Sequence, residues 1–207
     1  DLLVTETLLA RLQAIDPADP NYVSARLDLC NLLRRQIDQA PSDDEKRELA
    51  QQLQAAADDL RSRVKPGSDD PTKISGTARC VLMVADLARR GLLEKSRFRE
   101  SVDQAQKLVQ ILPADDKAWP DYHYQALLLG REEQQEDDVA RHAEWLLANA
   151  AGTSYEQSAL IVKALAIDRQ VAASTTPDTA LLEEGFDVYR RLVEHLGKTP
   201  AAVAPMG

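Results

Sequence analysis

The sequence predicts an all-α protein of about nine helices, packed in pairs as antiparallel hairpins. Three observations carry this prediction. Ala, Leu, Gln, Glu and Arg, which lose little rotamer freedom in a helix, are abundant, whereas the aromatic residues that favour strands make up only 4% of the 207 residues. Gly and Pro lie almost entirely between segments with helical apolar spacing. No segment alternates apolar and polar residues well enough to predict a strand.

Residues 1–65 are predicted to form an N-terminal segment of three helices, which ends at the strongest break in the chain. Ser42 and Glu45 form the S-x-x-E pattern of a capping box, so the third helix should begin at Asp43. The run from Pro66 to Pro71, PGSDDP, is the expected hinge. The three helices are predicted over about residues 2–15, 20–40 and 43–64.

Six further helices are predicted in residues 73–197, and residues 198–207 are expected to be a flexible tail or a cut linker. Gly91 ends the first of these helices, and Pro113 ends the second. Ser154 is the expected N-cap of the eighth helix, and Pro177 suits the first position of the ninth. The six are predicted over about residues 73–90, 94–112, 119–131, 134–149, 155–173 and 177–197.

These six helices alternate between two kinds. The fourth and the eighth are apolar nearly all round, and the sixth approaches this, whereas the fifth, seventh and ninth are apolar on one side. A helix that is apolar all round must be covered on several sides. The alternation therefore predicts stacked hairpins, in which each pair of helices buries its surface against neighbouring pairs.

Three segments share a spacing of small or apolar residues at positions i, i+4 and i+7, in which a small side chain lets two helices cross closely. This spacing resembles the second helix of the tetratricopeptide repeat family, and the resemblance covers about residues 73–197. It implies a right-handed solenoid that binds other proteins. The repeats are irregular, since the segments start 38 and 46 residues apart, whereas the family repeats about every 34. Other helical repeats could imitate the pattern. The segments are Ser101, Ala105, Leu108 and Pro113; Val139, Ala143 and Leu146; and Gly185, Tyr189 and Leu192.

The resemblance also implies a binding surface. In that family the first helix of each pair lines a concave groove that holds an extended peptide. Carried over by position, the groove would contain more apolar side chains than is usual, which favours a packed partner segment, including one from the same longer chain. The positions are Lys117, Tyr124, Leu127, Leu128, Leu160 and Lys163.

Charge is unevenly distributed along the chain, which has a net charge of −9. Residues 61–107 carry 11 basic and 6 acidic side chains, whereas the flanking regions are both acidic. This basic stretch, with Arg90, Arg97 and Arg99 near the Gly91 turn, either marks a surface for an acidic partner or consists of ordinary solvated helix faces. The acidic balance argues against a nucleic-acid ligand, and no segment is apolar enough to insert in a membrane.

The residue patterns of enzymes are missing from the sequence. There is no HExxH, GxSxG, P-loop or GxGxxG motif, so neither catalysis nor a cofactor is predicted. Asp138 and His142 lie four apart and could share a metal, but a third ligand is lacking. Cys30 and Cys80 have no CxxC spacing and are expected to be small buried hydrophobes, with a disulfide or a metal site as the alternative.

The predicted function is a non-catalytic scaffold or sensor module that binds proteins within a larger, bacterial, multidomain protein. Two alternatives remain open: a helical regulatory segment that gates a linked catalytic domain, and an α-helical effector or toxin domain. Because Asp1 opens the chain inside an apolar run without a leader, we expect a piece of a longer, cytoplasmic protein. The sequence leaves the oligomeric state open.

Overall fold

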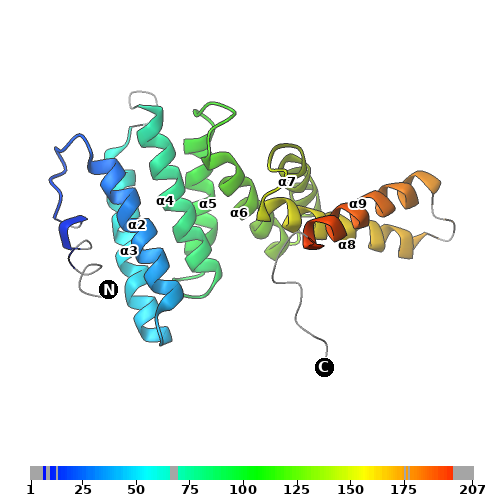
Figure 1. The fold of residues 1–207 in the computed structure, drawn as a ribbon, viewed down its shortest axis with the longest axis horizontal. Coiled ribbons are helices and arrows are strands. Elements are labelled where there is room, and N and C mark those ends of the chain that lie inside the picture. Colours follow the sequence, from blue (N-terminus) through cyan, green and yellow to red (C-terminus); the bar gives the residue numbers. More distant parts are fainter. Residues whose placement is uncertain are drawn as a thin grey trace. The chain divides into compact units, whose positions relative to one another are not determined.

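The computed structural model describes residues 7, 10–12, 14–65, 70–174, 176 and 178–197, and in these residues it contains helices and turns but no strand. The all-α prediction is therefore confirmed for this part of the chain (Figure 1). Most of the predicted helix over residues 2–15, most of the PGSDDP hinge, Pro177 and the tail 198–207 lie outside the described residues. The helices are α2 (Tyr22–Gln39), α3 (Asp43–Arg63), α4 (Pro71–Arg89), α5 (Ser96–Val109), α6 (Ala118–Glu132), α7 (Glu136–Asn149), α8 (Ser154–Ala173) and α9 (Thr179–Gly197).

Local capping explains where several helices begin. The Ser42 Oγ accepts a hydrogen bond from the Glu45 backbone N–H at 3.2 Å, as the capping box predicts. α4 begins two residues earlier than predicted, because the Asp70 carboxylate accepts from the Thr72 N–H at 2.7 Å and Pro71 suits the first turn. The prediction that Ser154 caps α8 is wrong. Thr153 occupies the N-cap with extended backbone, and Ser154 is already helical.

The chain forms two compact units, residues 1–125 and 126–207, and the division lies inside α6. In the first unit, α2 pairs with α3 and α4 with α5, while α4 also packs against both α2 and α3 (Figure 1). The Tyr22 hydroxyl at the start of α2 hydrogen-bonds the Asp59 carboxylate near the end of α3, so these two helices run antiparallel. The expected boundary at residues 66–72 therefore does not separate two cores. The shared core includes Leu29, Cys30, Leu33, Ile37, Leu53, Leu60, Cys80, Val84 and Leu87.

In the second unit, α8 packs against α7 on one side and α9 on another. Its core cluster is small, with Leu160, Ala164, Ile167 and Val188 as the buried members. A Cβ added to Gly185 would lie 3.3 Å from the Ile167 Cγ2, so glycine here allows α8 and α9 to approach closely. This agrees with the helix-crossing role predicted for Gly185. α8 and α9 are antiparallel, since the Glu156 carboxylate at the start of α8 pairs with Arg191 near the end of α9 at 2.8 Å.

The turn before α6 is fixed by polar contacts around Asp116. Its carboxylate accepts from the Ala118 N–H at 2.8 Å and from the Ser75 hydroxyl of α4 at 2.7 Å. The Trp119 indole N–H donates to the Pro113 carbonyl at 2.9 Å and so closes the turn. Because α6 begins at Ala118, Pro120 falls in its first turn, where a missing N–H removes no helical hydrogen bond.

Within the described residues, no helix is both long and apolar enough to cross a membrane.

Candidate protein-interaction surfaces

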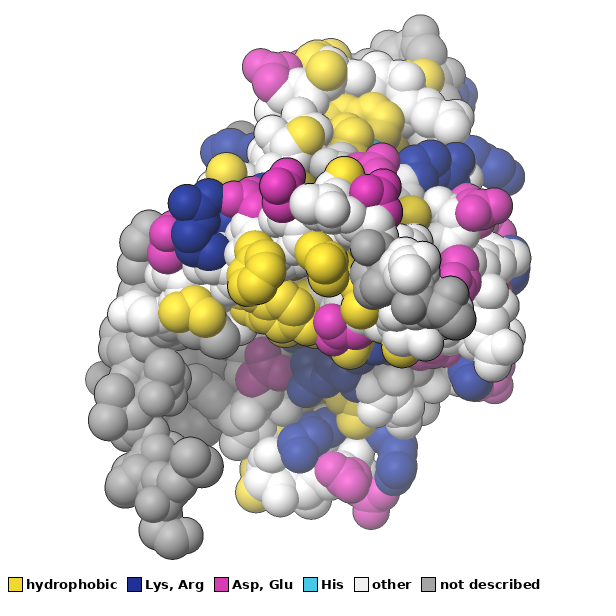
Figure 2. All heavy atoms as spheres, turned by 90° about the vertical axis from the view of Figure 1, so that its right-hand side faces the viewer, with side chains coloured by type: hydrophobic (Ala, Val, Ile, Leu, Met, Phe, Trp, Pro, Cys, Tyr) yellow, Lys and Arg dark blue, Asp and Glu magenta, His cyan; other side chains and the backbone are white. Residues whose placement is uncertain are grey.

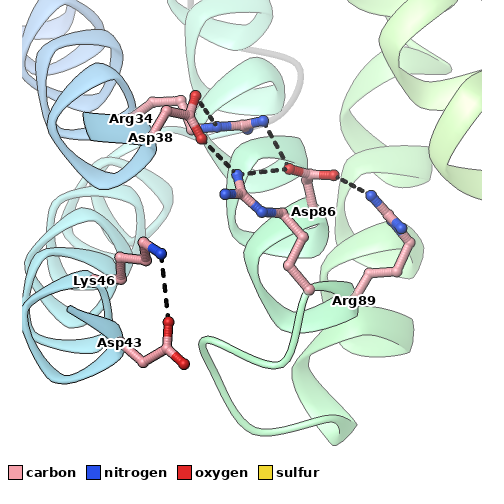
Figure 3. A network of polar contacts seen from close by, with 7 residues as sticks. Arg34, Asp38, Asp43, Lys46, Asp86 and Arg89 are labelled. Carbon is pink, nitrogen blue, oxygen red and sulfur yellow. Dashed lines mark hydrogen bonds and ion pairs between the residues drawn. The ribbon is translucent and has the colours of Figure 1, made fainter. Parts of the chain in front are cut away.

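The basic stretch, expected to be either a surface for an acidic partner or ordinary solvated helix faces, is largely engaged in ion pairs within its own unit. Figure 3 shows arginines of α2 and α4 converging on Asp38 and Asp86. The Asp86 carboxylate, which is buried, pairs with Arg34 at 2.8 Å and with Arg89 at 2.8 Å. Arg90 reaches from the C-terminal end of α4 to Asp38 of α2 at 2.9 Å. These ion pairs join the α2–α3 hairpin to α4.

The other basic residues of this stretch show the same pattern. Arg97 pairs with Glu100 at 3.1 Å and lies 4.0 Å from Asp58 of α3. Arg63 pairs with Asp59 at 2.8 Å. Arg99 is exposed on α5. Several basic residues of the stretch thus pair with carboxylates of α2 and α3, and others with carboxylates of α4, α5 and α6.

Asp59 illustrates how strongly these pairs are held. Burial alone would raise the pKa of this carboxyl, but hydrogen bonds from Tyr22 and Arg63, with the nearby charge of Arg26, bring it below the usual value. Arg26 and Arg63 also lie over the Tyr22 ring, at 4.9 and 5.4 Å from its centre. The start of α2 is therefore fixed to the end of α3 by both polar and ring contacts.

A groove of about 690 Å³ lies in the second unit, between the end of α6, α7, α8 and one residue of α9. Its apolar lining comes mainly from α7 and α8 and includes Val139, Ala143, Val162, Ala166 and Ile167. The groove thus combines apolar surface from two helices with many charged groups.

Charged side chains surround this groove in pairs. Lys163 of α8 pairs with Glu184 of α9 at 2.6 Å, and Arg169 of α8 pairs with Glu136 of α7 at 2.7 Å. All four line the groove, together with Arg131, Asp137 and Glu144. The pairs hold three helices around the groove, and most of their side chains are accessible enough to exchange partners with a ligand.

The small size of Gly130 and a tight turn after it bring α6 and α7 together at one end of the groove. A Cβ added to Gly130 would lie 3.0 Å from the Val139 Cγ2. In the turn between the two helices, Gln134 adopts a φ of 58°. The Gln135 N–H donates a hydrogen bond to the Gly130 carbonyl at 2.8 Å. A larger residue at 130 would push the start of α7 away, so Gly130 shapes this end of the groove.

The structure places the residues carried over from the repeat family in different environments. Lys163 lines the groove. Lys117 is exposed, and Tyr124 and Leu128 are half-buried. Leu127 and Leu160, in contrast, are completely buried and form part of the core. Their side chains are therefore closed to a partner in this conformation, because the apolar faces of α6 and α8 that carry them pack inward.

Asp138 and His142, the pair that could share a metal, have other roles in the structure. Asp138 pairs with Arg141 at 2.6 Å, while His142 is buried. Burial and the neighbouring Arg141 lower the pKa of His142 to about 4, so it is neutral near pH 7. In the part of the chain that the structure describes, no three His, Cys, Asp or Glu side chains are grouped to hold a metal.

The cysteines are free thiols inside the first unit. Cys30 and Cys80 are fully buried members of one apolar cluster. A hydrogen bond with Cys30, and then burial, raise the pKa of the Cys80 thiol well above its usual value. Both observations fit small buried hydrophobes with low reactivity.

Sequence reasoning missed an exposed apolar face on α8 and α9. Large hydrophobic side chains are exposed here, with Phe186 at 79% and Val193 at 67%. Figure 2 shows hydrophobic side chains gathered in one patch, with charged ones around them. The face consists of Ile161 and Leu165 of α8 and Leu182, Phe186, Tyr189 and Val193 of α9.

A signal for this face is present in the sequence. α9 carries an inward apolar stripe, Leu181, Gly185, Val188 and Leu192, and a second stripe shifted by one residue, Leu182, Phe186, Tyr189 and Val193. Packing of α9 against α8 buries only the first stripe. The second indicates a face that packing within the unit does not use.

Comparisons with known proteins add no family to this description. No family model, no curated protein and no solved structure matches this chain. What the chain does is therefore inferred from its own surfaces.

Proposed function

We propose that this chain is a non-catalytic protein-binding module, built of irregular tetratricopeptide-like hairpins, whose groove in residues 126–207 binds an extended peptide. The observation that carries the proposal is the groove itself, with apolar side chains of α7 and α8 between paired charges. Apolar anchors of a peptide would bury against the apolar lining, while its backbone and polar groups would meet the charged rim.

The antiparallel pairs α2–α3 and α8–α9, together with the packing of α4 on α5, support the hairpin part of this proposal. Small side chains at the crossings support it too, since Ser101 and Ala105 of α5 and Ala143 of α7 are buried. Tyr189 departs from the pattern, because it is exposed where the family would bury it. The repeats are accordingly proposed as irregular.

Two exposed alanines allow the groove to be blocked without disturbing the core. Ala166 of α8 and Ala140 of α7 both line the groove and are exposed. Ala148, also exposed on α7, does not line it and serves as the matched control. Ala166→Trp should fill the groove, whereas Ala148→Trp adds the same side chain outside it.

The test is selection of displayed random peptides on the immobilised chain, followed by binding measurements in solution. We expect selected peptides to bind the wild type and Ala148→Trp equally, and to bind Ala166→Trp and Ala140→Trp at least about tenfold more weakly, because each loses a buried anchor contact. Far-UV circular dichroism establishes that the variants are folded. Equal binding to all folded variants, or no enriched peptide, would overturn the proposal.

A further inference from the structure

The exposed stripe of α9 has the spacing of a helix–helix seam. Leu182, Phe186, Tyr189 and Val193 follow one another at intervals of four, three and four residues. These intervals are those of a and d positions in a heptad pattern, where each side chain inserts between residues of a facing helix. The stripe is about 16 Å long at 1.5 Å per residue, which is long enough to seat another helix.

α8 widens this seam into a continuous face. Ile161 and Leu165 are exposed one turn apart on α8. Asp168 lies one turn further along the same side of α8, and its carboxylate accepts a hydrogen bond from the Tyr189 hydroxyl at 2.6 Å. The exposed sides of α8 and α9 are thus adjacent. Contiguous exposed apolar surface of this kind marks an interaction site.

The charges beside the seam indicate which partner fits. Glu183 and Arg190 each follow a seam residue directly, and they carry opposite charges. The seam is symmetric about its midpoint between residues 187 and 188. If a second α9 lies antiparallel, residue 182 faces 193 of the copy and 186 faces 189. The same register places Glu183 of each copy across from Arg190 of the other, so that two identical ion pairs form.

A parallel arrangement lacks this match. Across a parallel seam, the residue before one seam position meets the residue after the next position of the partner. For Arg190 that neighbour would be Gly185, which is buried against α8 and carries no charge. The antiparallel register therefore explains the charge pattern, and the parallel one does not.

We propose that two copies of this chain associate through the α8–α9 face, with their α9 helices antiparallel across a twofold axis. The interface has an apolar centre formed by the two seams, with Ile161 and Leu165 beside it. Its rim carries two Glu183–Arg190 pairs. An apolar centre with a charged rim is the usual composition of such interfaces. The proposal is independent of the peptide-binding groove.

A charge exchange tests this register. Glu183→Arg places two arginines opposite each other at both rim pairs, and Arg190→Glu places two glutamates there. The double variant restores both pairs with reversed polarity. Because Arg190 also contacts Asp187 within α9, circular dichroism of each variant establishes that the helix remains folded.

The measurement is sedimentation equilibrium over a concentration series, from which the dimer dissociation constant follows. We expect a wild-type dimer, at least about tenfold weaker association for each single charge variant, and recovery in the double variant. Phe186→Asp should be monomeric. Ile111→Asp, which changes an exposed hydrophobic residue outside the face, should dimerise like the wild type.

Three results would overturn the proposal: a monomeric wild type at the highest concentration, a dimer that survives Phe186→Asp, or a double variant that remains as weak as the single variants. A monomer would mean that a different partner or another part of the chain covers the face. A dimer without charge recovery would mean that the antiparallel register is wrong.

Discussion

The two compact units of this chain use their side chains differently. In residues 1–125 the described apolar side chains form a large shared core, and Arg89 and Arg90 at the end of α4 pair with Asp86 and Asp38. In the described residues of 126–207 one core cluster centres on Leu160, Ala164, Ile167 and Val188, a groove is open, and six large hydrophobic side chains are exposed on α8 and α9. The first unit thus pairs many of its charged groups internally, whereas the second leaves apolar surface exposed.

This difference separates stability from binding. Groups that are paired or buried within a unit stabilise it and offer little to a ligand. Exposed apolar groups contribute little to folding and much to association. Substitutions in the first unit should therefore change mainly the free energy of unfolding, and those on the open surfaces of the second should change mainly binding.

Each unit contains one tryptophan, Trp119 in the first and Trp145 in the second. Single-tryptophan variants, with phenylalanine at the other position, therefore report the unfolding of each unit separately. The predictions below use these two reporters in urea titrations.

The largest expected effect is in the core of the first unit. Leu33→Ala removes a fully buried side chain, and we expect a loss of about 2–5 kcal/mol in the free energy of unfolding reported by Trp119, from lost burial and a remaining cavity. Phe186→Ala, at protein concentrations low enough for a monomer, should change the value reported by Trp145 by less than about 0.5 kcal/mol. Similar losses at both positions would contradict the contrast between the units.

Acidification should destabilise the second unit in particular. The unfolded His142 titrates near pH 6.5, whereas burial and Arg141 lower the pKa of the folded residue to about 4. Between these values the unfolded chain binds a proton that the folded unit does not, so the free energy of unfolding falls as the pH is lowered. The full shift corresponds to at most about 3 kcal/mol.

The measurement is the urea midpoint reported by Trp145 at several pH values between 7 and 4. His142→Gln should remove this dependence in the same range. Below about pH 4.5 a further loss is expected, because a hydrogen bond from Gly152 and the contact with Arg191 lower the pKa of Glu156. An equally steep decline in His142→Gln would show that His142 is not the cause.

The close approach of α8 and α9 gives the next effect. Gly185→Leu should cost about 1–3 kcal/mol, because even the first carbon would lie 3.3 Å from Ile167. Gly185→Ala should cost less, since Ile167 needs to move by only a few tenths of an ångström. The Trp145 reporter measures both variants. Equal stability of Gly185→Leu and the wild type would rule out the helix-crossing role.

These particular residues also show what the sequence could predict. The capping box at Ser42, the separation of helices near Gly91 and the crossing at Gly185 are local patterns, and the structure contains all three. A helix begins earlier than predicted where the prediction did not include its cap, as at α4, which Asp70 caps. The basic surface was harder to predict, because Arg90 finds Asp38 across two helices whose relative rotation no local pattern specifies.

The candidate site was only partly predictable for the same reason. Of the positions carried over from the repeat family, Lys163 lines the groove of the second unit, whereas Leu127 and Leu160 are buried. A helix that is apolar on most sides does not reveal which side is covered. The exposed face of α9 follows from its two adjacent stripes, but a stripe alone does not say whether its cover belongs to the same unit.

The smallest expected effect concerns the hydrogen bond that caps the N-terminus of α3. Ser42→Ala removes the hydroxyl that accepts from the Glu45 N–H at the start of α3, and we expect a loss of about 1 kcal/mol reported by Trp119. Ser62→Ala is the matched control, because the Ser62 hydroxyl donates to the Asp59 carbonyl near the other end of α3. Its loss leaves no backbone donor unsatisfied, so the change should be a few tenths of a kcal/mol at most. If both substitutions cost the same, the capping hydrogen bond does not stabilise α3.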